Sequence, residues 1–152
     1  MRSLVDGRHR EEIVRRFQSL LRDDRRQWGR MSLPEMLCHV RGAFCLAMGE
    51  IERTGEAPPQ PLPPRMLKFF ALRVPMRWPR GIKTVPELEA GAPAMNALSF
   101  EQERRLALDE MDRFLQPGRR LVNHPMFGPM SYRDWMRWGY LHTDHHLRQF
   151  GR

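Results

Sequence analysis

The chain has 152 residues, yet it contains only two cysteines and no long apolar run. No window holds the ~18 consecutive apolar residues expected of a membrane-spanning helix. The N-terminus lacks the apolar core of a signal peptide and soon becomes charged. Cys38 and Cys45 lie about two helical turns, or ~10 Å, apart on one predicted helix, which is too far for a disulfide. We therefore expect a cytoplasmic protein without membrane insertion and with free thiols.

The sequence also lacks the usual signatures of a nucleic-acid or nucleotide site. It has no long basic tail, no glycine-rich phosphate loop and no zinc-finger spacing. The net charge is +8, from 26 basic and 18 acidic residues, but the basic residues are dispersed along the chain in short groups. We interpret this charge as solvated surface and do not expect a nucleic-acid partner.

Apolar periodicity instead predicts four main helices, over residues 8–21, 32–53 and 99–115 and from residue 131 onward. Ser32 with Glu35, and Ser99 with Gln102, have the spacing of a capping box, and Ser131 is a suitable N-cap for the last helix. No internal repeat and no strand pattern is found.

Two segments between the second and third helices do not fit a regular helix. Residues 57–64 contain five prolines and predict an extended connector. A short apolar piece, 66–74, follows. Residues 81–97 have little periodicity and predict either a lid over a site or a plain packing loop. The sequence thus predicts one all-α domain, 1–152: a four-helix bundle with a long proline-rich crossover between helices two and three.

Histidines are the chemically informative residues of the last helix. His142 and His146 are spaced i, i+4, so both rings project from one face about one turn apart. His39 borders the apolar stripe of the second helix and completes a three-imidazole set of the kind that binds Zn²⁺. The pattern predicts a metal site made by His39, His142 and His146.

Other residues give alternatives or additions to this set. His145, at i+3 from His142, is a second candidate for chelation; otherwise it lines the pocket. The further candidates for the pocket wall or for contact with the ligands are His124, Trp135, Trp138 and Gln149. The simpler interpretation is that these histidines are only hydrogen-bonded core residues.

These motifs resemble those of the DinB-like superfamily, and more narrowly an uncharacterised branch of it. The resemblance rests on Trp28-Gly29-Arg30-Met31-Ser32 ahead of His39, on Asn123-His124-Pro125-Met126-Phe127-Gly128-Pro129, and on His142-x-x-His145-His146-x-x-Gln149. It implies a four-helix bundle, often dimeric, in which His39, His142 and His146 bind Zn²⁺ or Ni²⁺. This chain departs from the usual pattern after His146, where Leu147-Arg148-Gln149 replaces an Arg-Gly-Gln-like run.

The resemblance implies two kinds of activity. The first is a metal-dependent thiol S-transferase, which would take a low-molecular-weight thiol, and the second is a hydrolase acting on a small molecule. The alternative from another class is a non-catalytic bundle that a metal stabilises or that binds a small molecule. The sequence names no separate general base.

Overall fold

The computed structural model describes residues 1–152 and is all-helical. Loops and two short 3₁₀ turns join five α-helices. The elements are α1 (Gly7–Gln18), α2 (Leu33–Ala47), α3 (Pro64–Arg73), η1 (Pro86–Leu88), η2 (Pro93–Met95), α4 (Phe100–Phe114) and α5 (Tyr132–Gln149). None of the helices combines the length and the apolar character that a membrane crossing requires.

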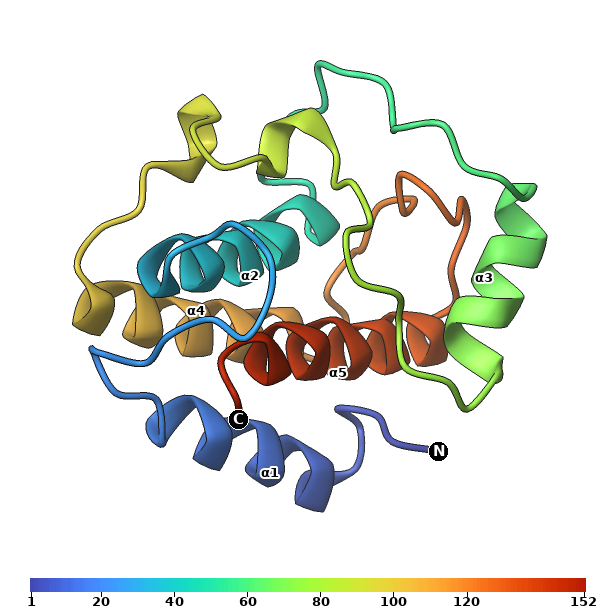
Figure 1. Ribbon diagram of the computed structural model, residues 1–152. Helices are drawn as coiled ribbons and strands as arrows, with labels where there is room; N and C mark the ends of the chain where they lie inside the picture. Colours follow the sequence, from blue (N-terminus) through green and yellow to red (C-terminus); the bar gives the residue numbers. More distant parts are fainter.

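The helices α1, α2, α4 and α5 form the bundle (Figure 1). In Figure 1, α2 and α4 run in one direction, whereas α1 and α5 run in the other. Because α2 and α4 are parallel neighbours, the chain must travel back along the bundle between them. Residues 48–99 make this crossover and include α3, which lies across the beginning of α5. The predicted bundle with a long crossover is therefore confirmed.

Three bundle helices begin at the serines that the sequence indicates. Ser32, Ser99 and Ser131 each accept a hydrogen bond from the backbone N–H three residues on. The side chain of that third residue accepts one from the backbone N–H of the serine, so each pair forms a complete capping box. Two backbone donors that the first helical turn would leave unpaired are satisfied at each start.

The predicted end of the second helix, near residue 53, is wrong. Helix α2 ends at Ala47, and Gly49 follows with a φ of 75°. The Gly49 N–H donates to the Leu46 carbonyl at 3.0 Å, and the Glu50 N–H donates to the Cys45 carbonyl at 2.9 Å. This pair of bonds is a Schellman motif, which ends a helix at a glycine able to adopt the left-handed conformation.

One smaller prediction also needs correction, and one helix was not predicted. Helix α1 ends at Gln18 rather than at residue 21, and Leu21, assigned to its apolar face, is exposed. The short apolar piece 66–74 is largely a helix of its own, α3, with Pro64 in its first turn, where the missing proline N–H costs nothing.

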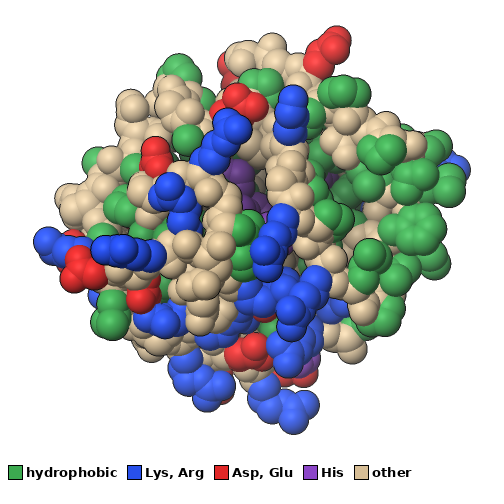
Figure 2. Space-filling model, viewed as in Figure 1, with side chains coloured by type: hydrophobic (Ala, Val, Ile, Leu, Met, Phe, Trp, Pro, Cys, Tyr) green, Lys and Arg blue, Asp and Glu red, His purple; other side chains and the backbone are tan.

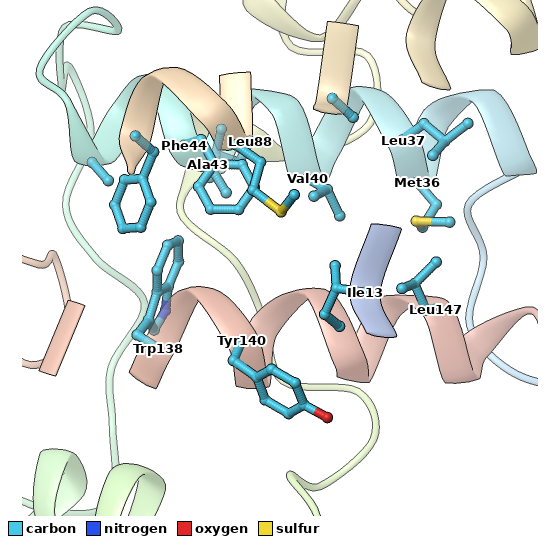
Figure 3. Packing of buried hydrophobic residues seen from close by; sticks show 14 of the residues in the cluster. Ile13, Met36, Leu37, Val40, Ala43, Phe44, Leu88, Trp138, Tyr140 and Leu147 are labelled. Atoms are coloured by element: carbon cyan, nitrogen blue, oxygen red, sulfur yellow. The ribbon is translucent and has the colours of Figure 1, made fainter. Parts of the chain in front are cut away.

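The core between α2, α4 and α5 is aromatic and closely packed. Figure 3 shows Trp138 pointing from α5 toward Phe44 of α2. The ring centroid of Phe44 lies 6.2 Å from that of Trp138 and 5.0 Å from that of Phe114. A Cβ on Gly139 would lie only 2.9 Å from Leu4 and 3.2 Å from Phe114, so glycine permits this approach. This packing sets the rotation of α5, and therefore the direction of the histidines that follow.

Candidate metal centre

Three histidines from two helices converge at the centre of the bundle. His39 comes from α2, and His142 and His146 come from successive turns of α5. One ring nitrogen of each residue lies within 4.8 Å of those of the other two. The exposed fractions are 5%, 9% and 8%, respectively. The structure thus brings together the three residues that the sequence singles out, which we call the histidine cluster.

Hydrogen bonds orient two of these rings. The Nδ1 of His39 lies 3.0 Å from the carbonyl oxygen of Leu88, and the Nδ1 of His146 lies 3.1 Å from Oε1 of Gln149. Both oxygens can only accept, so each Nδ1 carries the proton and each Nε2 keeps a free lone pair. Histidines that bind metals commonly donate their other ring N–H to such an oxygen.

The third ring is held by stacking and has an unpaired nitrogen. His142 lies nearly parallel to Trp138, with ring centroids 4.8 Å apart and an interplanar angle of 13°. Its Nδ1 is buried and has no hydrogen-bond partner. Leaving such a group unpaired costs about 1–3 kcal/mol. A buried imidazole without a complete set of protein partners fits a site that receives a ligand from outside the chain.

Burial keeps the three rings neutral. It lowers the pKa of His39, partly opposed by the hydrogen bond to Leu88. Burial also holds the pKa of His142 well below its ordinary value, with further lowering from His146 and His39. The pKa of His146 is held well below its ordinary value by burial and then by His39 and His145. Neutral imidazoles present the lone pairs that a metal ion needs.

No carboxylate joins the histidine cluster. Three neutral nitrogen donors suit a divalent ion such as Zn²⁺ or Ni²⁺, and three protein ligands leave a coordination position for water or substrate. The residues present therefore fit the metal that the sequence motifs imply.

A protein-family model matches residues 5–152, which include all five α-helices and the histidine cluster. The chain belongs to the family described as "protein of unknown function (DUF1569)". No curated protein and no solved structure matches the chain. The DUF1569 match supports an uncharacterised domain family, and the wider DinB-like resemblance stays a prediction.

The remaining candidate residues lie at different distances from the cluster. Gln149 touches His146 and Trp138 stacks on His142, so both border the cluster directly. His145 points to another side, with its ring centroid 6.0 Å from that of Trp28 and 6.2 Å from that of Trp78.

Trp135 and His124 lie one layer behind the cluster. Their ring centroids are 5.2 and 5.6 Å from that of Trp138. The Nδ1 of His124 accepts hydrogen bonds from the backbone N–H groups of Met126 and Phe127, both at 3.2 Å. Burial lowers the pKa of His124 to about 3. His124 therefore organises the turn at residues 124–128 as a neutral acceptor.

The sequence did not indicate that the crossover supplies a hydrogen-bond partner to the histidine cluster. The Leu88 carbonyl comes from η1, inside the segment predicted as a lid or a packing loop. This turn can lie against α2 because Gly42 has no side chain: a Cβ there would be 2.4 Å from Met95 and 3.1 Å from Leu88. A glycine inside a helix indicates that another part of the chain packs closely there, but not which residue it is.

Gly29 makes a second close approach, to Gln149. Its φ is +85°, and a Cβ would lie 2.2 Å from Nε2 of Gln149. The backbone N–H of Gln27 donates to the carbonyl of Gln149 at 2.7 Å. The segment before α2 is thus packed closely against Gln149, whose side chain orients His146.

Proposed function

We propose that this DUF1569 protein binds a divalent metal ion, Zn²⁺ or Ni²⁺, through His39, His142 and His146, and that the site acts on a small molecule. The observation that supports this most is the convergence of three neutral imidazoles, two of them oriented by oxygens that accept from Nδ1. Three protein ligands with an open position are typical of catalytic zinc sites, whereas structural sites usually have four.

When bound, the metal would supply a Lewis acid that lowers the pKa of a coordinated water or holds a thiol as thiolate. The chain's own residues hold and shape the site. Leu88 and Gln149 keep the Nε2 atoms of His39 and His146 available, and Trp138 covers one face of His142. Because the donors are uncharged, the ion keeps its full charge, which favours an anionic ligand.

The reaction that we propose is a thiol S-transfer or a hydrolysis. The likeness of the two histidine motifs to the DinB-like superfamily favours a low-molecular-weight thiol as one substrate. No carboxylate lies in the cluster to serve as a general base, which suits a nucleophile that the metal itself activates.

A second candidate is a metal that only stabilises the bundle. It is favoured by the origin of the ligands, because the ion would tie α2 to α5 across the core. A ligand that binds only the folded state stabilises it by about 2.7 kcal/mol at a hundred times its dissociation constant. Removal of the metal would then lower the melting temperature and leave no activity to lose.

Elemental analysis of protein purified without an affinity tag tests the proposed site. We expect a stoichiometric metal in the parent and in His145→Ala, and loss of it in His146→Ala. Full occupancy in His146→Ala would transfer the ligand role to His145. Addition of thiol to the cobalt-substituted protein should change its visible spectrum, and an unchanged spectrum would contradict the S-transferase.

A further inference from the structure

A cavity of about 340 Å³ lies beside the histidine cluster and is rich in arginine. No acidic side chain lines it. Its size falls at the lower end of the range found for small-molecule sites. The arginines that line it are Arg77, Arg80, Arg148 and Arg152. We call it the arginine pocket.

Two of these arginines have partners and two do not. Arg148 pairs with Asp144 at 2.9 Å, and Arg152 pairs with Asp24 at 2.6 Å. Arg77 and Arg80 form no ion pair and no side-chain hydrogen bond. Two exposed guanidinium groups of the pocket therefore have no carboxylate partner.

Trp28 also lines the arginine pocket and contacts one of the two unpaired arginines. The guanidinium of Arg80 lies over the ring of Trp28, with its Cζ atom 4.3 Å from the ring centroid. A pocket that offers guanidinium groups but no carboxylate selects an anion.

The arginine pocket shares a wall with the histidine cluster. The ring centroid of Trp78 lies 6.2 Å from that of His145 and 6.4 Å from that of His142. His145 in turn lies 5.2 Å from His146 between ring centroids. Figure 2 shows Lys and Arg side chains gathered in the lower half of this face, next to a hollow in which histidine is visible.

We infer that the arginine pocket binds the carboxylate or phosphate group of a small organic substrate, whose reacting end reaches the histidine cluster. Only the second part of this inference, that the reacting end reaches the histidine cluster, rests on the proposed metal function. Guanidinium groups match both anions by forked hydrogen bonds, and the uncompensated charge of a metal held by neutral histidines adds to the attraction.

Anion binding is tested first on the metal-free protein. Inorganic phosphate and acetate are titrated separately, by tryptophan fluorescence and by the shift in melting temperature. We expect at least one of them to bind saturably, and Arg77→Gln/Arg80→Gln to weaken that binding at least about tenfold, the loss expected from one charge-assisted hydrogen bond. The anion that binds more tightly identifies the chemistry of the group.

The matched control is Arg119→Gln/Arg120→Gln, which removes the same charge from two exposed arginines that form no ion pair. It should bind the anion as the parent does. Absence of saturable binding of both anions, or an equal loss in the control, would overturn the pocket as a site.

The link to the metal is tested with cobalt-substituted protein. Its visible spectrum is titrated with ω-mercaptocarboxylates and with neutral ω-mercaptoalcohols of the same chain lengths. For at least one length, the charged thiol should act at about tenfold lower concentration, and Arg77→Gln/Arg80→Gln should remove that advantage. No advantage at any length would overturn the assignment of an anionic substrate. Failure to take up cobalt would instead overturn the proposed metal function. The phosphate and acetate titrations alone would then test the arginine pocket.

Discussion

Replacing Gly29 by alanine should weaken metal binding although Gly29 is not a proposed ligand. Its φ of +85° is one that residues with a Cβ rarely adopt, and the new Cβ would lie 2.2 Å from Nε2 of Gln149. The amide of Gln149 must therefore move. Because its Oε1 accepts from Nδ1 of His146, that ring loses the contact that orients it.

The size of the effect has two parts. The left-handed backbone costs a residue with a Cβ roughly 1–2 kcal/mol. Loss of the hydrogen bond between Gln149 and His146 adds about 0.5–1.5 kcal/mol. Together the two parts lower the free energy of unfolding by about 1.5–3.5 kcal/mol, and each kcal/mol lowers the melting temperature by about 2–4 °C in a chain of this length. Loss of such an oxygen partner typically costs about 10–100-fold in metal affinity.

Gly118→Ala provides the matched control. Gly118 has a φ of +76°, and a Cβ there would meet nothing within 4 Å. It should therefore lose only the backbone part, about 1–2 kcal/mol, and bind metal as the parent does. Thermal unfolding of the metal-free variants gives the first quantity, and competition with a chromogenic chelator gives the second. Unchanged metal affinity in Gly29→Ala, or an equal loss in both variants, would refute the reasoning.

Two further predictions concern groups outside the cluster. Burial lowers the pKa of His124 to about 3, below an unfolded value of about 6.5. The unfolded chain therefore binds the extra proton between these values, and the stability contributed by neutral His124 falls as the pH drops below about 6.5, by up to about 1.4 kcal/mol per pH unit. His124→Asn keeps a hydrogen-bond acceptor at this position. It should reduce the number of protons taken up on unfolding by about one, as measured from the pH dependence of the free energy of urea unfolding from about pH 7 to pH 4. The side chain of Glu103 is 0% exposed and pairs with Arg41 at 2.9 Å, so Glu103→Gln should cost about 3 kcal/mol. Glu101→Gln, which breaks an exposed pair on the same helix, should cost much less because solvent screens that pair, and equal losses in urea unfolding would contradict this assignment.

The starts of the bundle helices were more predictable than their ends, for a physical reason. A start such as Ser32 with Glu35 is decided by two side chains three residues apart, and both are visible in the sequence. The end of α2 depended on Gly49 adopting the left-handed conformation while the apolar Ile51 continued the stripe. The sequence contains both a glycine that can end the helix and an apolar residue that would continue it, and only the packing of the chain determines which one applies.

The candidate site, too, has parts that the sequence predicts and parts that only packing determines. His142 and His146 belong to one helix, so their spacing alone places the rings together. The Leu88 carbonyl is a backbone atom that every residue has, and its position depends on how an aperiodic loop packs on α2. No residue pattern identifies such an acceptor, or the wall that Trp78 forms from the same crossover.

The choice between His145 and His146 shows how core packing decides chemistry. Successive residues of a helix are ~100° apart, so His146 lies about 20° from Gly139 around α5, whereas His145 lies about 120° from it. Gly139 is buried where Leu4, Phe114 and Phe44 approach α5, and this turns the face that carries His146 toward α2. His145 is thereby directed to Trp28 and Trp78 at the arginine pocket. One rotation of the helix therefore assigns one histidine to the proposed metal and its neighbour to the proposed anion site. Gly139→Ala, whose Cβ would meet Leu4, Phe114 and Phe44, should therefore weaken metal binding and anion binding together, as measured on one variant by chelator competition and by phosphate and acetate titration. Loss of only one of the two would contradict the shared dependence on the rotation of α5.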